Sequence, residues 1–237
     1  MGMTLWIILG IFALGVILCF LLAVANHSGE RFFERYEEVD KMMIEDEISP
    51  IDFVSTINKN HFNGKLKIAQ LSEVGDDAYH KDTLYLSWKT LSNPSIASFT
   101  IIAHEMGHAL QDKTGKKLKK LTALRRLGRV LGIIFFPILI SGGVLLFFNQ
   151  TLFIAGLCLL SFAVLIFVLS LIIKLRTISI EKDASEKAII FLQEILTEKE
   201  LNESKKFLKD AKLTYWGDFL RIFLWWTGMS RKTRMFN

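Results

Sequence analysis

The chain has 237 residues, of which 51% are hydrophobic and 22% charged, and its formal net charge is +5. This length suits one ordinary domain with a small second layer, and the composition excludes a disordered chain and differs from that of an average soluble domain. The positive charge does not indicate a nucleic-acid partner, because the basic residues lie beside long apolar runs.

An uninterrupted apolar run from Leu5 to Ala25 is long enough to span a membrane. A secretory signal peptide has a basic start, a shorter apolar stretch and a small-residue cleavage site, and no basic residue precedes this run. We therefore interpret residues 1–25 as a retained N-terminal transmembrane anchor, with a cleaved signal as the alternative.

Residues 26–128 are predicted to form the first part of an extramembrane domain, which begins with two helices. Residues 30–47 are acidic and helical in pattern. Ser49 and Pro50 then supply the N-cap and the first-turn proline of a second helix, which Gly64 closes.

Alternating apolar positions predict two short strands, over residues 65–74 and 82–88, around a turn at residues 75–77. We expect residues 82–88 to form an edge strand, beside which an extended peptide can pair.

Asn93 and Pro94 begin a long helix by the same pattern of a cap followed by proline, and this helix is predicted to end near Asp112, before Gly115. Residues 103–109 of this helix have the sequence Ala-His-Glu-Met-Gly-His-Ala, which contains the pattern H-E-x-x-H.

This pattern indicates a zinc site. His104 and His108 are four residues apart, so both imidazoles lie on one face of the helix and can bind one metal ion. Glu105 can reach a water on that ion. Zinc lowers the pKa of such a water to about 7, and the glutamate takes its proton as hydroxide attacks a carbonyl.

The alternative is a pair of surface histidines on an ordinary amphipathic helix. The flanking residues are apolar, however, and buried polar groups need partners, which a metal and its water supply. Gly107 costs about 1 kcal/mol in a helix and therefore indicates the close approach of another element.

A basic stretch follows this helix. Leucines alternate with the basic residues at near-helical spacing, which predicts an amphipathic helix at the membrane interface. The basic residues are Lys113, Lys116, Lys117, Lys119, Lys120, Arg125, Arg126 and Arg129.

Two further apolar runs, Val130 to Phe148 and Leu152 to Ile173, are separated only by residues 149–151. Each run can cross a bilayer, so we predict a tight antiparallel transmembrane hairpin within residues 129–173. The alternative is a buried helical hairpin in a soluble protein.

Cys19 and Cys158 both lie inside predicted spans, so neither a disulfide framework nor a thiolate metal site is indicated.

The charges that flank the spans predict the topology. Arg31 and Arg35 follow the first apolar run, and Lys174 and Arg176 follow the third. Basic residues collect on the cytoplasmic side of spans. We therefore expect the N-terminus and residues 149–151 outside a cell membrane that the chain crosses several times, and the remainder in the cytosol.

Residues 174–237 are predicted to form the second part of the domain. Residues 179–196 have helical spacing, and Thr197 with Glu200 forms a capping-box pattern for a final cytosolic helix. Residues 213–229 are aromatic and apolar but include charged side chains, which favours an interfacial helix over a fourth span.

A catalytic zinc site has three protein ligands and a water, and no H-E-x-x-H-x-x-G-x-x-H continuation follows His108. Glu181, just past the third apolar run, is the leading candidate for the third ligand, because the hairpin should return it towards His104. The alternative is an ordinary first-turn glutamate favoured by the helix dipole. Asp183 and Glu186 do not share its helix face, since two residues correspond to about 200° of rotation.

The other histidines, His27, His61 and His80, are isolated in the sequence, and we expect each to be solvent-exposed or packed. His80 precedes the predicted edge strand, which is the one argument for placing it in a cleft.

Together these features resemble the YugP-type neutral zinc metallopeptidases of bacterial membranes. The resemblance spans nearly the whole chain: the anchor, the membrane hairpin and residues 86–87, 95–97, 103–111, 180–185 and 213–215. It implies a zincin-like α+β catalytic domain with a gluzincin-like site, in which Glu181 completes the zinc ligands and Asp183 supports them.

The chain departs from the family pattern at two places. The family tends to carry Asp-His-Tyr before the second strand, where this chain has Asp77-Ala78-Tyr79-His80, so the role of that family histidine does not transfer. Lys182 stands where the family favours an aromatic residue, which changes the packing but not the ligands.

We therefore expect an α-helical membrane protein with about three transmembrane helices, and a fourth near the C-terminus as the alternative. Its expected activity is zinc-dependent cleavage of peptides or membrane proteins, with Glu105 as general base. A catalytically silent zinc-binding scaffold and a prenyl-protein-type protease are the other readings. The presence of Glu105 argues against the silent scaffold, because a structural zinc site does not need a general base. The small number of spans argues against the prenyl-protein-type protease. No feature of the sequence indicates an oligomeric state or an adaptor.

Overall fold

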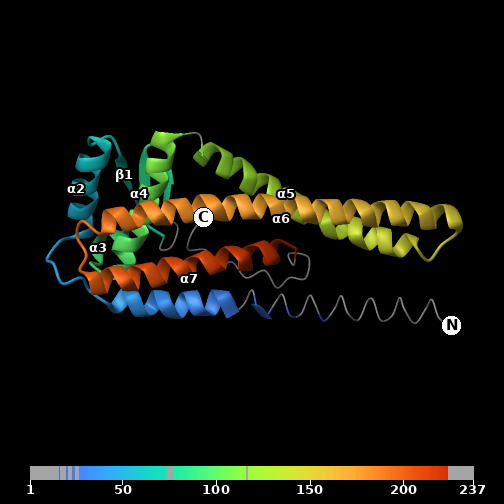
Figure 1. Cartoon of the computed structure of the whole chain (residues 1–237), viewed down its shortest axis with the longest axis horizontal. Coiled ribbons are helices and arrows are strands. Elements are labelled where there is room, and N and C mark those ends of the chain that lie inside the picture. The colour runs from blue at the N-terminus through green and yellow to red at the C-terminus, as the bar shows by residue number, and fades with distance from the viewer. Residues whose placement is uncertain are drawn as a thin grey trace.

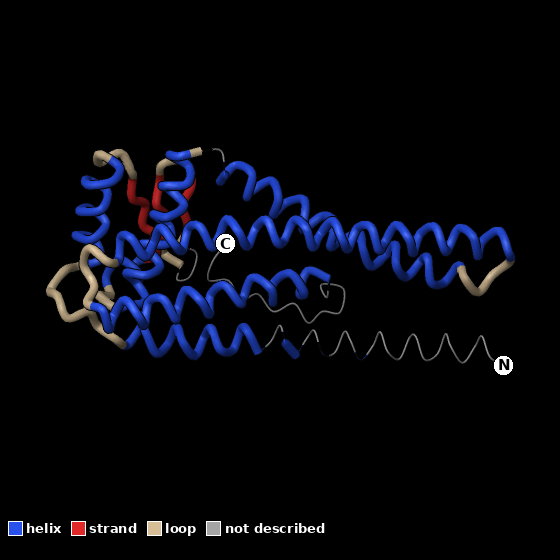
Figure 2. Tube along the Cα trace, viewed as in Figure 1, coloured by secondary structure: helices blue, strands red, loops and turns tan. Residues whose placement is uncertain are grey.

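The structure is a computed structural model, and it shows a mainly helical chain with one small sheet (Figures 1 and 2). It describes Val16, Phe20, Ala23, Val24 and residues 27–73, 77–115 and 117–223, with the backbone alone at residues 117–120 and 218–223. The predicted anchor, residues 1–25, lies almost entirely outside the described residues.

Two helices open the described part of the chain. Residues 27–41 are helical, ending before the predicted boundary at residue 47. Helix α2, Pro50–Phe62, begins as predicted, because the Ser49 hydroxyl accepts a hydrogen bond from the Asp52 amide at 3.1 Å. It ends at Asn63, whose left-handed backbone caps the helix one residue before the predicted glycine.

The sheet differs from the prediction. Strands β1 (Lys67–Leu71), β2 (Ala78–His80) and β3 (Thr83–Ser87) have the order β1-β3-β2, with β1 parallel and β2 antiparallel to β3. The expectation that residues 82–88 form an edge strand is therefore wrong, because β3 is the central strand and β2 lies at the edge.

Local chemistry explains why β2 is not evident in the sequence. The strand has three residues, too few to show an alternating pattern. It joins β3 through Lys81 and Asp82, both with positive φ, a tight hairpin turn that usually contains glycine or asparagine.

Helix α3, Trp88–Ser92, leads into helix α4, Ile96–Thr114. Ser95 is the N-cap of α4 and accepts a hydrogen bond from the Ser98 amide at 3.3 Å, so the helix begins two residues after the predicted Asn93 cap. Helix α4 is buried along most of its length, and its Phe99 contacts Phe53 of α2, with 5.0 Å between the ring centroids.

Helices α5 (Lys117–Leu145) and α6 (Gln150–Leu192) form a long hairpin that projects from the rest of the molecule (Figure 1). Both are long and apolar enough to cross a membrane, because the most apolar 18-residue stretch has a mean hydropathy of 1.9 within Leu121–Leu145 and of 3.0 within Gln150–Leu192. The basic stretch from Lys117 onward and the second apolar run form one helix, α5. The third run and the helix predicted from residue 179 share α6, because no glycine or proline separates them.

The two hairpin helices approach closely near its closed end. A Cβ atom added at Gly156 would lie 2.7 Å from the carbonyl oxygen of Gly142. Small residues at helix crossings permit such backbone contact in membrane proteins.

Helix α7, Glu198–Phe223, follows a capping box that the sequence predicts correctly. The Thr197 amide donates to the Glu200 carboxylate at 2.8 Å, and the Glu200 amide donates back to the Thr197 hydroxyl at 3.4 Å. The predicted interfacial segment continues α7 as far as the structure describes it. One hydrophobic core joins α2, α4 and the sheet to the ends of α6 and α7.

Candidate metal centre

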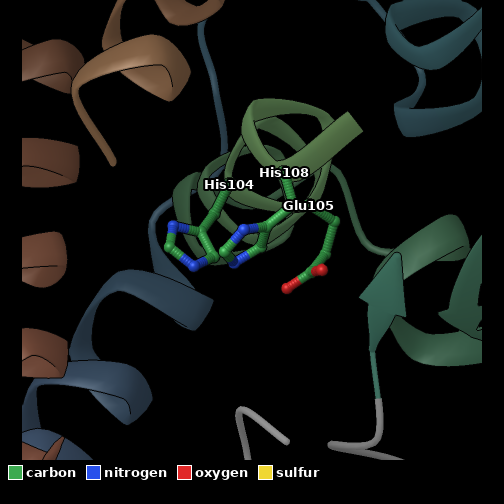
Figure 3. A group of neighbouring side chains, drawn as sticks. All are labelled: His104, Glu105 and His108. Atoms are coloured by element: carbon green, nitrogen blue, oxygen red, sulfur yellow. The ribbon is translucent and has the colours of Figure 1, made fainter. Parts of the chain in front are cut away.

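Helix α4 places His104, Glu105 and His108 on one side, with the two imidazoles adjacent and the carboxylate beside them (Figure 3). The three residues are buried, with exposed fractions of 3%, 5% and 6%. One ligand atom from each lies within 4.8 Å of the others. The four-residue spacing thus produces the predicted cluster, which has the donor atoms to hold a metal ion.

Helix α6 brings Glu181 to the same point. Its Oε2 atom lies 3.4 Å from His104 Nε2 and 3.3 Å from His108 Nε2. Zinc bonds of about 2.0–2.1 Å in a tetrahedron separate neighbouring ligand atoms by roughly 3.3–3.4 Å. Both distances from Glu181 Oε2 to an imidazole nitrogen therefore match the spacing of ligands around one zinc ion, and the residues present fit the metal.

Close contact between α4 and α6 makes this convergence possible. A Cβ atom at Gly107 would lie 2.3 Å from the carbonyl oxygen of Ala184, one turn along α6 from Glu181. The absence of a side chain at Gly107 thus lets the two helices pack closely. This agrees with the sequence prediction, because a glycine that destabilises a helix indicates the close approach of another element.

Replacing Gly107 by alanine is expected to force the helices apart and to lower the free energy of unfolding by about 1–3 kcal/mol. The added Cβ atom would meet the backbone of Ala184, which cannot move aside as a flexible side chain can. The measurement is denaturant unfolding of the purified protein. Gly143→Ala, in α5, is the matched control, since nothing lies within 4 Å of its added Cβ atom. Equal stability of the two variants would contradict the packing argument.

Polar partners on the far side of each imidazole orient the rings. The His108 Nδ1 atom lies 3.0 Å from Gln111 Oε1, and Gln111 Nε2 donates to Asp183 Oδ2 at 2.7 Å. The His104 Nδ1 atom lies 3.3 Å from the hydroxyl of Ser185. Such partners fix the tautomer of a histidine and leave its Nε2 atom free to bind a metal.

Asp183 thus accepts a hydrogen bond from Gln111, which in turn contacts His108, and Glu186 forms an exposed pair with Lys182. Gln111 and Ser185 were not among the site residues predicted from the sequence. Their spacing was a usable signal, because each lies three or four residues from a predicted ligand on the same helix.

Strand β2 holds Glu105. The backbone amide of Tyr79 donates to Glu105 Oε2 at 2.7 Å. Burial raises the pKa of the Glu105 carboxyl, while the two imidazoles and this hydrogen bond oppose the rise. The hydrogen bond comes from the backbone of a strand that the sequence does not reveal.

The charges of Glu181 and its neighbours are strongly coupled. Burial opposes ionisation of Glu181, but the two histidines and Arg125 hold the pKa of its carboxyl well below the usual range. Burial alone would lower the pKa of the His108 imidazole. The nearby Glu181 carboxylate outweighs the effect of burial and raises this pKa to about 9. In the absence of metal, the carboxylate thus favours a proton on the His108 imidazole, where a cation would otherwise bind.

The site opens into a cavity of about 230 Å³. Its wall includes Leu121, Thr122 and Arg125 from α5, Tyr215 from α7 and His80 from β2. His80 is exposed, as the sequence predicts, and it also lies on the wall of this cavity. His61 lies apart and packs against Phe191.

Comparison with known proteins identifies a family. The model of the family described as “Putative neutral zinc metallopeptidase” matches residues 10–225. No curated protein and no solved structure matches the chain.

Proposed function

Because the chain belongs to this family of neutral zinc metallopeptidases, we propose that it is a zinc-dependent membrane endopeptidase. The observation that carries the proposal is the convergence of His104 Nε2, His108 Nε2 and Glu181 Oε2 at zinc-ligand spacing. These three residues are the proposed ligands, and Glu105 is the proposed general base.

When bound, zinc would supply a water with a pKa near 7 and polarise the peptide carbonyl. Glu105 faces the same buried site from the next position on α4 and can accept the proton of that water. The Tyr79 amide holds the carboxylate in place, and the raised pKa of Glu105 suits a group that takes a proton and passes it to the leaving amine.

A zincin-like arrangement is part of the proposal. Its support is the position of the edge strand β2 beside α4, where Tyr79 contacts Glu105 and His80 lines the cavity. A peptide that adds to this sheet at the site would pair with β2.

The silent zinc-binding scaffold is the second candidate, and the position of Glu105 weighs against it. A structural zinc site is closed by four protein ligands, whereas this one has three and a carboxylate beside a cavity. The two readings differ in one assay. The proposed enzyme cleaves peptides, loses the activity with a zinc chelator and regains it with zinc, while a scaffold binds zinc and cleaves nothing.

The membrane location rests on the α5–α6 hairpin. Many large apolar side chains along it are exposed, including Val164 at 62% and Leu165 at 60%, which a core helix of a soluble protein would bury. The basic residues at the start of α5 and the mid-helix Lys174 and Arg176 lie at the same end of the hairpin as the metal centre. We therefore propose that this end is cytoplasmic.

A cysteine placed at Gln150 is expected to react with an impermeant thiol reagent added to intact cells, because the hairpin would expose its closed end outside. A cysteine at Lys119 is expected to react only after the cells are opened. Labelling is measured in a Cys19→Ser, Cys158→Ser background. The reverse labelling pattern would put the catalytic site outside the cell.

The proposed substrates are membrane proteins and polypeptides near the cytosolic face, because the cavity wall includes the part of α5 where the hairpin leaves the body. Membranes from cells with the wild-type protein and with Glu105→Gln can be compared by proteomics. Substrates should accumulate intact with the variant.

A further inference from the structure

The two oxygen atoms of Glu181 have different partners. Oε1 accepts a hydrogen bond from Arg125 Nη2 at 2.5 Å. Oε2 accepts one from the Tyr215 hydroxyl at 2.9 Å and is the oxygen that faces both imidazoles. The carboxylate is 1% exposed, and these contacts fix its rotation about the bond to the side chain.

Arg125 reaches this site from α5, the first helix of the hairpin. It is half-buried and lines the cavity, while its neighbours Arg126 and Arg129 on the same basic stretch are exposed. The stretch thus has one arginine directed at the metal centre. Tyr215 reaches the carboxylate from α7, so four helices contribute to the site.

We propose that Arg125 is a positioning residue that holds Oε1 of Glu181 and thereby leaves Oε2 as the only oxygen available to the metal. This inference rests on the proposed function, since it describes how one proposed ligand binds.

The chemistry of the two groups supports this role. A carboxylate binds a metal through one or both of its oxygens, and five-coordinate zinc forms readily. A guanidinium remains charged at any physiological pH and makes directional hydrogen bonds to carboxylate oxygens. Because the guanidinium holds Oε1 towards α5 while Oε2 faces the two imidazoles, Glu181 offers the metal one ligand atom, and a fourth position stays open for water.

Tyr215 is compatible with this arrangement. A carboxylate oxygen has two lone pairs, so Oε2 can accept from the hydroxyl and bind a metal at the same time. Lys174 lies over the ring of Tyr215, with its Nζ atom 5.5 Å from the ring centroid, which keeps the ring beside the site.

The test uses cobalt(II) as the probe, bound to the full-length purified protein, because four-coordinate cobalt absorbs visible light more strongly than five-coordinate cobalt. Arg125→Gln is expected to free Oε1, give two-oxygen binding by Glu181 and lower the absorption several-fold. Arg125→Lys keeps the positive charge and should restore much of the wild-type spectrum. Arg126→Gln, an exposed neighbour on the same helix, should leave the spectrum unchanged.

A wild-type spectrum in folded Arg125→Gln would overturn the inference. X-ray absorption of the zinc-loaded wild-type protein decides it without any variant, because a carboxylate bound through both oxygens would also overturn it. Loss of folding in Arg125→Gln therefore leaves a decisive measurement. Failure of the wild-type protein to bind either metal would instead contradict the proposed function.

Discussion

Replacing Glu105 by glutamine is expected to lower peptidase turnover by about 10²–10⁴-fold while zinc stays bound, because proton transfer by a positioned side chain contributes that much to catalysis. Glutamine has nearly the same shape and keeps an oxygen that can accept from the Tyr79 amide. It cannot take a proton from water. The structure thus predicts loss of chemistry without loss of the site.

The measurement is turnover of a peptide substrate together with the zinc content of the same preparation. Glu186→Gln is a matched control, because it makes the same chemical change at an exposed side chain that pairs with Lys182. Cleavage by Glu105→Gln at the wild-type rate would show that Glu105 is not the base and would favour the silent scaffold.

Replacing Glu181 by alanine is expected to cause the largest loss of zinc affinity among the acidic residues of α6. Its Oε2 atom lies 3.4 Å from His104 Nε2 and 3.3 Å from His108 Nε2. The variant also removes the partner of Arg125, so its fold is checked by circular dichroism. Affinity is measured by competition with a chelator of known strength.

Asp183→Ala should weaken zinc binding less, by about 10-fold to 100-fold, the usual effect of losing a group that orients a ligand. It acts through Gln111 on His108, which places it at the lower end of that range. Glu186→Ala should have little effect. The reverse order, with Glu181→Ala retaining zinc and Asp183→Ala losing it, would refute the ligand assignment.

The motif on α4 is evident from the sequence because its geometry is local. Four residues of helix place His104 and His108 side by side whatever the rest of the chain does. Gly107 likewise indicates a close helix contact, and the structure identifies the partner as Ala184. The capping box at Thr197 is predictable for the same reason, since its two hydrogen bonds span only three residues.

The surroundings of the motif depend on contacts between distant segments, and sequence patterns do not reveal them. Arg125 belongs to a stretch of similar basic residues, and only the packing of α5 on α6 selects it. Tyr215 is one of many aromatic residues near the C-terminus. Strand β2 is too short to produce a periodic pattern, although it supplies both the Tyr79 amide and His80.

Zinc content of the purified protein tests the central claim most directly. The three converging donor atoms predict about one zinc per chain, the content of a single catalytic site, and its removal by a chelator should abolish peptidase activity. Elemental analysis of full-length protein, before and after loading with zinc, gives the number. A content that remains a small fraction of one equivalent after loading would contradict the account.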